Sequence, residues 1–384
     1  MIILLYLVDY NRNSYVSLRE DRNYFFECFL CKLYRNSVCA LNSRIGKDTL
    51  NRTFKVTLEN GERYVLQNIN VNVFKKPYEL MENINGVCAH IKKKAEALNE
   101  DPRKVSMTFA EAEDGTTVYL DPNGKYYRMC LYIDGISYQS ISRPELFYSA
   151  AEAFGDFQYR LADYPAEKLF ETIPNFHNTV SRFADFKEAI EGCDLPERLL
   201  ESKDECDFLL SREHMAHIAI DPINEGKMPL RVTHNDTKLN NVLIDPDTDK
   251  GMCVIDLDTV MPGSVLYDFG DAVRFGACTS AEDEPDTSKV GFDLELFEQF
   301  TKGYIRGLGG ALTDIEYDLL AEGALLMTYE LCLRFLGDYL NGDTYFKINY
   351  EKHNLVRARA QIALLRDMEA KLPEMKAIVH GCRG

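Results

Sequence analysis

Apolar and polar residues alternate in the first third of the chain, and this pattern predicts β-structure. In TFKVTL (53–58), every second residue from Phe54 onward is apolar; an Asn-Gly pair follows, and RYVLQ (63–67) returns. Alternation on both sides of such a turn is typical of a β-hairpin. TVYL (117–120), a Pro-Asn-Gly turn and YYRMCLYI (126–133) predict a second hairpin.

A helical period appears between the two hairpins and dominates the rest of the chain. Residues 78–98 repeat apolar positions at spacings of three and four, and after residue 135 the same period predicts helices over 144–161 and 183–191. An apolar stripe over 355–372 predicts a long closing helix. Such stripes are core-facing sides of amphipathic helices.

The chain length fits this division into a β-rich part and a helical part. A chain of 384 residues exceeds what one compact core usually holds. We expect an α+β, bilobal protein with a small β-rich lobe at 41–134 and a larger, mainly helical lobe at 135–384. Residues 1–40 show no clear period and are treated as a separate segment.

Composition narrows the class of protein. The net charge of −17 argues against nucleic acid or an anionic membrane as the main partner. Of the cysteines, only Cys28 and Cys31 form a C-x-x-C, with no second pair for zinc, so we expect reduced thiols and a cytoplasmic location. The first apolar run ends at Asp9, well short of the roughly 20 residues of a membrane helix.

The stretch RVTHNDTKLNNVLID (231–245) carries the strongest chemical signal. His234, Asp236 and Asn241 have the H-x-D-x₄-N spacing of kinase catalytic loops, in which the Asp accepts a hydroxyl proton and the Asn holds Mg²⁺. Because phosphoryl transfer needs alignment and charge neutralisation, these residue types suit the reaction. Lys238 would place a positive charge beside the moving phosphoryl group.

A second strand, MCVIDLDTVMPG (252–263), follows after a turn and supplies further carboxylates. A hairpin would bring Asp256 next to Asn241, which predicts a metal site made of one carboxylate and one amide. Alternation along the strand places Asp258 on the same face, as a second and weaker ligand candidate. The later triplet beginning at Asp268 looks like a kinase Asp-Phe-Gly motif, but we expect Asp268 to brace the loop.

Each of these residues also has an ordinary structural interpretation. Asp and Asn in loops usually cap turns through their own backbone, and a single match would favour that explanation. The whole set, in a strand-turn-strand context, favours a kinase. His214 and His217 lie three residues apart without an evident third ligand, so we expect a packed or solvated pair.

With these motifs the chain resembles the aminoglycoside phosphotransferase-like kinases, and among them the N-acetylhexosamine 1-kinases, over about residues 44–380. Besides the catalytic loop, the strings that carry the resemblance are YVLQNIN (64–70), AFGDFQ (153–158), VIDLDTVMPGSVLYDFGDAVRFGA (254–277), RFLGDYLNGD (334–343) and HNLVRARAQI (353–362). The resemblance implies a protein-kinase-like bilobal fold, ATP with Mg²⁺, and transfer to the anomeric hydroxyl of N-acetylglucosamine or N-acetylgalactosamine.

The resemblance also implies roles for individual residues, matched by motif. His234, Asp236 and Lys238 belong to the catalytic loop, with Asp236 as the base. The remaining roles are metal binding by Asn241 and Asp256, sugar contacts by Phe275 and Arg334, and adenine contacts by the backbone of Tyr132 and Ile133.

Two positions depart from the pattern of the related kinases. Gln67 stands where many kinases carry a strand lysine for the α- and β-phosphates. The loop RIGKDTLNRTF (44–54) has a single glycine, and its Asp48-Thr49 replaces a Gly-His pair near the sugar, which makes Thr49 a candidate acceptor contact. The second departure bears on the choice of acceptor.

Three other functions stay open at this point. The same scaffold could phosphorylate another small alcohol, such as an amino sugar, homoserine or choline. The chain could bind a nucleotide without turnover, or the aspartates could serve a metal-dependent hydrolase, although one histidine and one ligand pair are few for a two-metal site. We expect a monomer that acts on a small molecule.

Overall fold

The computed structural model describes residues 51–58, 60–112, 114–141 and 143–383, together with the backbones of three earlier strands. The chain divides into two compact units, Met1–Asp134 and Gly135–Gly384. The Cys28 and Cys31 pair and the acceptor candidate Thr49 lie outside the described residues.

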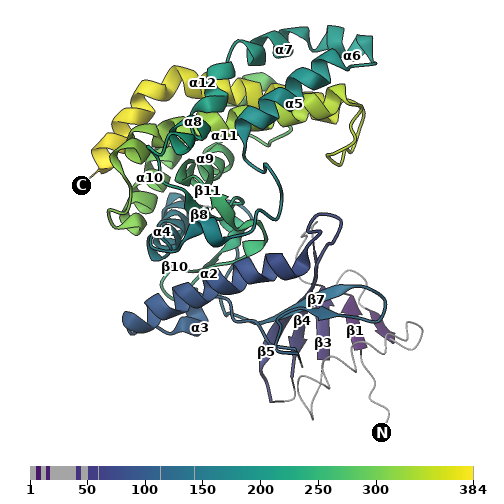
Figure 1. The fold of residues 1–384 in the computed structure, drawn as a ribbon, viewed down its shortest axis with the longest axis vertical. Coiled ribbons are helices and arrows are strands. Elements are labelled where there is room, and N and C mark those ends of the chain that lie inside the picture. The colour runs from purple at the N-terminus through teal and green to yellow at the C-terminus, as the bar shows by residue number, and fades with distance from the viewer. Residues whose placement is uncertain are drawn as a thin grey trace. The chain divides into compact units, whose positions relative to one another are not determined.

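The first unit is built on an antiparallel sheet (Figure 1). In the described part of the chain its strands stand in the order β3-β4-β5-β7-β6. They are Ala40–Arg44 (β3), Arg52–Thr57 (β4), Arg63–Asn68 (β5), Tyr119–Leu120 (β6) and Tyr126–Leu131 (β7), and a separate pair joins Tyr6–Asp9 (β1) to Ser14–Ser17 (β2). Both predicted hairpins are confirmed, as β4 with β5 and β6 with β7.

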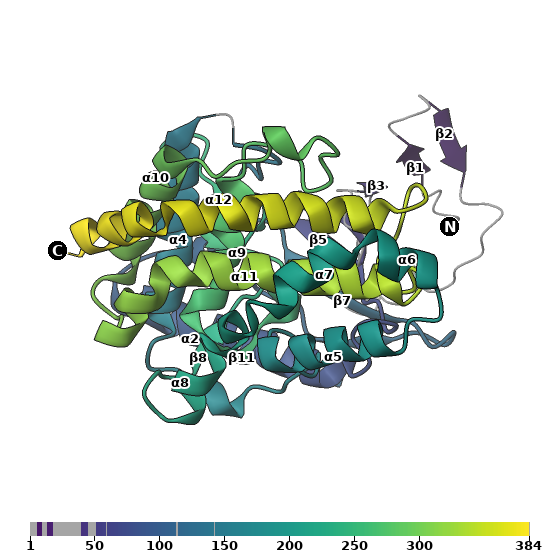
Figure 2. The same ribbon diagram turned by 90° about the horizontal axis from the view of Figure 1, so that it is seen from above.

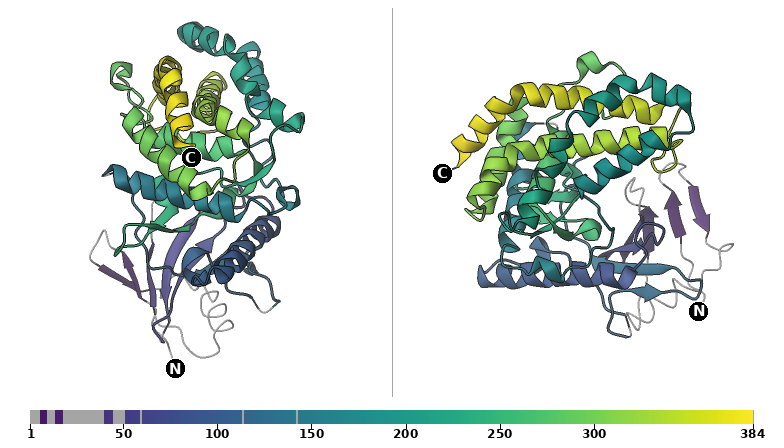
Figure 3. Two further views of the ribbon diagram at one scale, coloured as in Figure 1. Left: turned by 90° about the vertical axis from the view of Figure 1, so that its left-hand side faces the viewer. Right: turned by 45° about the horizontal axis from the view of Figure 1, so that its top comes forward.

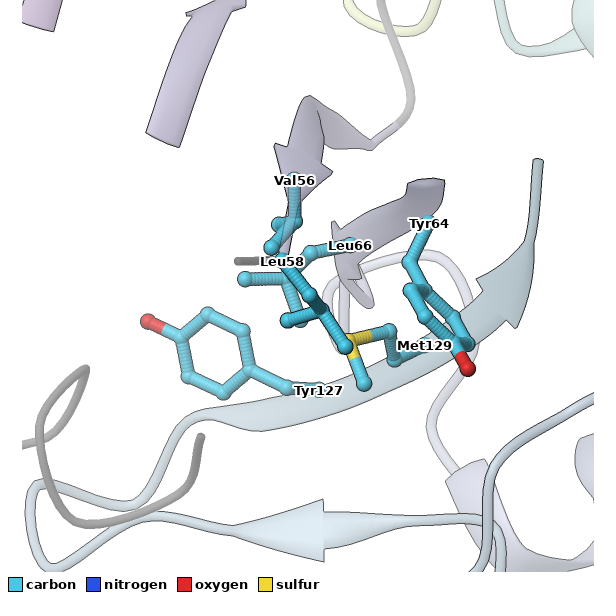
Figure 4. Close-up of a cluster of buried hydrophobic side chains, with 6 residues drawn as sticks. All are labelled: Val56, Leu58, Tyr64, Leu66, Tyr127 and Met129. Atoms are coloured by element: carbon cyan, nitrogen blue, oxygen red, sulfur yellow. The ribbon is translucent and has the colours of Figure 1, made fainter. Parts of the chain in front are cut away.

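Strand alternation gives this sheet an apolar face and a partly polar one. The apolar face gathers the buried cluster shown in Figure 4: Val56, Leu58, Tyr64, Leu66, Tyr127 and Met129. Gln67 and Arg128, next to members of the cluster, point to the other face. There Arg128 approaches Met81 of α2 (Pro77–Ala97), the predicted amphipathic helix, which is followed by α3 (Pro102–Val105).

The second unit is mainly helical. Its α-helices are α4 (Pro144–Arg160), α5 (Thr179–Glu191), α6 (Pro196–Glu201), α7 (Lys203–Leu210), α8 (Ile220–Asn224), α9 (Val265–Gly276), α10 (Leu294–Leu308), α11 (Asp314–Leu340) and α12 (His353–Cys382). Short 3₁₀-helices, labelled η, include η1 (Ala166–Lys168), η2 (Glu213–His217) and η5 (Thr287–Lys289). The long α11 packs against α5, α9 and α12, and α12 runs along it (Figures 2 and 3). The helices predicted over 144–161 and 183–191 are confirmed, and the closing helix is longer than 355–372.

Glycines allow the closest helix contacts in this unit. A Cβ at Gly270 of α9 would lie 2.1 Å from the carbonyl oxygen of Gly323 in α11, and a Cβ at Gly155 of α4 would lie 2.2 Å from that of Tyr304 in α10. Such distances exclude a side chain, so these helices meet backbone to backbone. The contact with α11 holds α9, which directly follows the catalytic motif.

Six short elements carry that motif: β8 (Arg231–Thr233), η3 (Leu239–Asn241), β9 (Val242–Ile244), β10 (Gly251–Val254), η4 (Leu257–Thr259) and β11 (Met261–Gly263). The predicted hairpin is confirmed as the antiparallel pair β9 and β10. A second antiparallel pair, β8 with β11, closes the segment on itself. The sequence does not predict this pair, because each strand has only three residues and β8 is buried along its whole length, so no clear alternation marks them.

Candidate active site

The loop after β8 brings together two predicted catalytic residues and one predicted metal ligand. Lys238 Nζ lies 2.6 Å from Asp236 Oδ1, and Asn241 Nδ2 donates to the carbonyl oxygen of Asp236 at 2.8 Å and to its Oδ2 at 3.1 Å. Burial alone would lower the pKa of Lys238, but Asp236 and Asp271 outweigh it and raise that pKa. Lys238 therefore stays a cation beside the carboxylate.

The buried side chain of His234 contacts the backbone of this loop and of the segment after β10. Its Nδ1 accepts a hydrogen bond from the Asp236 amide at 3.2 Å, its Nε2 lies 2.9 Å from the Ile255 carbonyl oxygen, and its ring packs edge-on against Phe154. The side chain is fully buried. Both nitrogens contact backbone groups, so His234 positions the loop. The catalytic role expected for it stays a prediction.

Asp268, near the start of α9, fixes the same loop. Its side chain accepts hydrogen bonds from the amides of His234 and Asn235 at 2.9 and 2.8 Å and from Gln158 Nε2 at 2.8 Å, while its carbonyl accepts from Thr237 Oγ1. Burial raises the pKa of Asp268, and the donated hydrogen bonds oppose that shift. The bracing role predicted for this residue is confirmed.

The backbone turns sharply at two positions in the catalytic segment, one before the predicted base and one at the predicted metal ligand Asp256. Asn235 and Asp256 both adopt left-handed conformations, with φ of 64° and 60°, which Asn and Asp tolerate better than most residues. The Ile255 amide donates to the Asn241 carbonyl oxygen at 2.9 Å, so Asp256 directly follows the residue paired with Asn241.

The argument that placed Asp258 beside Asp256 is wrong. Strand β10 ends at Val254, and the left-handed turn at Asp256 leads into η4, so strand alternation does not extend to Asp258, which is buried. Across the described residues, no three His, Cys, Asp or Glu side chains gather as a metal site. The pair of Asn241 and Asp256 stays the candidate, since an amide oxygen and a carboxylate are ligands that Mg²⁺ accepts.

Arg334 and Phe275, the two predicted sugar contacts, lie in different surroundings. Arg334 of α11 forms a 3.6 Å ion pair with the buried Glu330, and its guanidinium lies 5.8 Å from the Tyr345 ring and 5.5 Å from the Phe346 ring. Arg334, Tyr345 and Phe346 line a cavity of about 160 Å³. Phe275, at the end of α9, is 45% exposed and does not line the cavity that the described residues form here.

The predicted nucleotide contacts lie in the first unit. Gln67 Oε1 accepts from Arg128 Nε at 2.9 Å, and Gln67 Nε2 donates to Thr53 Oγ1 at 3.3 Å. The Tyr132 amide already donates to the Arg63 carbonyl oxygen at 2.9 Å. The adenine contacts expected from the backbone of Tyr132 and Ile133 stay a prediction.

Sequence reasoning missed two buried charged residues next to predicted ones. Arg128, 2% exposed, holds the side chain of Gln67, and Glu330, fully buried, holds Arg334. Each of the two residues has a sequence feature that could have identified it. Arg128 is a cation inside the apolar run of the second hairpin, and Glu330 lies four residues before Arg334, the spacing of an ion pair on one helix face.

Several solved structures share this fold. A crystal structure of an aminoglycoside phosphotransferase from Alicyclobacillus acidocaldarius subsp. acidocaldarius is 12% identical, with a TM-score of 0.59 over 92% of this chain and 96% of that one. An amicoumacin kinase in complex with AMP-PNP and Ca²⁺ is 13% identical, with a TM-score of 0.56 over 92% and 94%. A microcompartment-associated aminopropanol kinase is 16% identical, with a TM-score of 0.52 over 89% and 94%.

These similarities confirm the α+β, protein-kinase-like fold class. Each helix within the described residues is too short or too polar to cross a bilayer. The resemblance to N-acetylhexosamine 1-kinases in particular stays a prediction. The sequence pattern of the phosphotransferase enzyme family matches residues 42–308, well over half of the chain. The chain therefore belongs to the phosphotransferase enzyme family.

Proposed function

We propose that this phosphotransferase moves the γ-phosphoryl group of ATP to the anomeric hydroxyl of an N-acetylhexosamine and so forms the sugar 1-phosphate. The observation that carries the proposal is the convergence of Lys238 and Asn241 on the carboxylate of Asp236. A base, a fixed cation and an amide within one loop are the groups that phosphoryl transfer to a hydroxyl requires.

In this mechanism Asp236 accepts the proton of the acceptor hydroxyl. Its carboxylate is about one-quarter exposed, so a bound hydroxyl can reach it. Lys238 sits 2.6 Å from the same carboxylate and would stabilise the negative charge of the phosphoryl group during transfer. The surrounding hydrogen bonds fix both side chains in advance, and placement supplies much of the rate enhancement in this class of reaction.

Asn241 and Asp256 would hold Mg²⁺, which when bound neutralises phosphate charge. The geometry of Asn241 fits this role. Because its Nδ2 donates to Asp236, its Oδ1 is turned away from that residue and is left as the ligand atom. Asp256 supplies a carboxylate from the turn after β10, directly after Ile255, whose amide donates to the Asn241 carbonyl oxygen.

The acceptor class follows from the surroundings of Arg334. A guanidinium beside Tyr345 and Phe346, in a cavity of about 160 Å³, combines a forked donor for hydroxyl groups with flat apolar surfaces for a sugar ring. We assign acceptor binding and catalysis to residues 135–384. Nucleotide binding falls to residues 41–134, with Gln67, Tyr132 and Ile133 as contacts.

Product analysis tests the proposal directly. The purified protein is incubated with ATP, Mg²⁺ and N-acetylglucosamine or N-acetylgalactosamine, and phosphorus NMR should show an anomeric phosphate. The Asp236→Asn variant is the control for contaminating kinases. Homoserine, choline and unacetylated amino sugars form the comparison panel, and a clear preference for any of them would overturn the assignment of the acceptor.

Two further outcomes would replace the proposal with another function. Phosphate release from ATP at the same rate with and without acceptor would indicate a hydrolase. Nucleotide binding without transfer to any acceptor would indicate a non-catalytic binding protein.

A further inference from the structure

A second cavity, of about 150 Å³, lies against the catalytic loop within the second unit. Asn235, the residue immediately before the predicted base, forms part of its wall, together with His177 and the ring of Tyr267. Much of the remaining wall is apolar and includes Ile223 and Leu230. The cavity is therefore suited to a small ligand with an apolar face and few polar groups.

His177 is held in this wall by a buried carboxylate. Its Nδ1 lies 2.9 Å from Glu330 Oε1, and Glu330 is fully buried. Burial alone would raise the pKa of Glu330, but His177 and Arg334 outweigh it and lower that pKa. Glu330 is therefore ionised near neutral pH and can only accept, so Nδ1 of His177 carries the proton that it donates.

The other ring nitrogen of His177 is the unusual feature. Nε2 lies on the side of the ring away from Nδ1 and Glu330, and it has no hydrogen-bond partner among the described residues, although the side chain is only 7% exposed. Buried polar atoms are nearly always paired, so an orphaned one indicates a partner that the protein alone does not supply. A hydroxyl group both donates and accepts, so it can pair with this ring nitrogen in either protonation state of the histidine.

The surroundings connect His177 with the acceptor residues. Glu330 pairs with both His177 and Arg334, and the guanidinium of Arg334 lies 5.9 Å from the ring of Phe176, which also lines this second cavity. Burial alone would raise the pKa of Asp271, but Arg274, and after it Lys238 and His177, lower that pKa.

We propose that His177 is a specificity residue for the acceptor, and that its Nε2 forms a hydrogen bond with one hydroxyl group of the bound sugar. Glu330 orients the ring, and Tyr267 with the apolar wall lines the space beside the histidine. The inference rests on the proposed function, since it concerns the same acceptor. A hydroxyl group is the ligand chemistry that an oriented imidazole nitrogen would select over an apolar group.

His177→Asn is the sharpest test. The shorter amide can still donate to Glu330 but lacks an atom at the position of Nε2. We expect the KM for the acceptor to rise about 3- to 10-fold, the loss of one hydrogen bond, while the KM for ATP changes less than about twofold. A purely structural role would shift both KM values together.

Deoxy analogues of the acceptor identify the hydroxyl involved. The analogue that lacks the partner of Nε2 should show the same KM with the wild type and with His177→Asn, whereas every other analogue should still distinguish the two. If no analogue behaves in this way, the proposed hydrogen bond does not exist.

Leu230→Trp tests the cavity without touching the buried pair. Leu230 is 43% exposed, so a larger side chain is tolerated there, and it should occupy the cavity and raise the acceptor KM. Leu210→Trp is the matched control, because Leu210 is 36% exposed and lines neither cavity formed by the described residues. An acceptor KM unchanged in both His177→Asn and Leu230→Trp would overturn the inference.

These assays use whichever alcohol the purified enzyme phosphorylates best in the acceptor panel. Failure of N-acetylhexosamine as a substrate would therefore refute the assigned acceptor without deciding the role of His177. Failure of the His177 tests would leave the acceptor assignment intact.

Discussion

The sheet of the first unit and the catalytic segment of the second (231–263) are both made of short antiparallel strands, but different forces hold them. The sheet is held by an apolar cluster in which Leu66 is fully buried. The catalytic segment depends on directed hydrogen bonds. The Asp268 carboxylate accepts hydrogen bonds from the amides of His234 and Asn235, and Thr259 Oγ1 donates to the His234 carbonyl oxygen at 2.6 Å.

This difference explains why one segment stabilises and the other performs chemistry. Apolar burial is roughly proportional to area and tolerates small shifts. Hydrogen bonds lose strength quickly with distance and angle, so a network of them fixes the position of a loop. The carboxylate of Asp236 is placed by such a network. We therefore expect substitutions in the two regions to separate activity from stability.

The largest effect on turnover should come from Asp236→Asn. The substitution removes the proposed base, and kcat should fall by about 10²- to 10⁴-fold. Stability should hardly change, because the partly exposed pair with Lys238 is worth less than about 1 kcal/mol. Steady-state kinetics and urea unfolding of the same preparation measure both quantities.

Asp247→Asn is the matched control for that experiment. Asp247 is an exposed residue of the turn between β9 and β10, in the same segment but with an ordinary turn function. Its kcat and unfolding free energy should stay at wild-type values. Turnover of Asp236→Asn within tenfold of the wild type would rule out Asp236 as the base.

Asp268→Asn should have an intermediate effect on turnover and a clear effect on stability. The amide in place of the carboxylate turns a donor toward backbone amides that need an acceptor, which should lower the unfolding free energy by about 2–4 kcal/mol. The displaced loop should lower kcat by roughly 10- to 100-fold, measured per folded molecule.

Asp286→Asn provides the comparison for Asp268→Asn. Asp286 also accepts a backbone amide, that of Ser288, but at the surface, where Asn caps a turn about equally well. We expect wild-type behaviour from it. If Asp268→Asn lost stability and kept full kcat, the network would hold the fold without positioning Asp236, and the contrast between the two regions would fail.

How much of this was predictable depends on how far apart the interacting residues lie in the chain. The hairpin of β4 and β5 was predicted because alternation and a Gly-containing turn are local. The catalytic loop was predicted because its residues lie within one short motif. His177 and Glu330 are 153 residues apart, and no local period relates them, so their contact appears only once α11 packs in the core.

The same reasoning explains the error at Asp258. Alternation is a reliable guide only while the chain stays a strand, and the left-handed turn at Asp256 ends it after Val254. An Asp residue is compatible both with a strand and with a left-handed turn. The choice is made by contacts of η4 with the rest of the segment, which the sequence pattern does not contain.

The smallest effect on turnover should come from Leu66→Ala in the sheet. Leu66 is fully buried in the apolar cluster, so truncation should lower the unfolding free energy by about 2–5 kcal/mol through lost burial and a cavity. Because the hydrogen bonds around Asp236 are made within the other unit, kcat per folded molecule should stay within about threefold. Leu120→Ala, at a residue 45% exposed in the same sheet, should change neither quantity, whereas a tenfold loss of kcat in Leu66→Ala would show that apolar packing also sets the catalytic geometry.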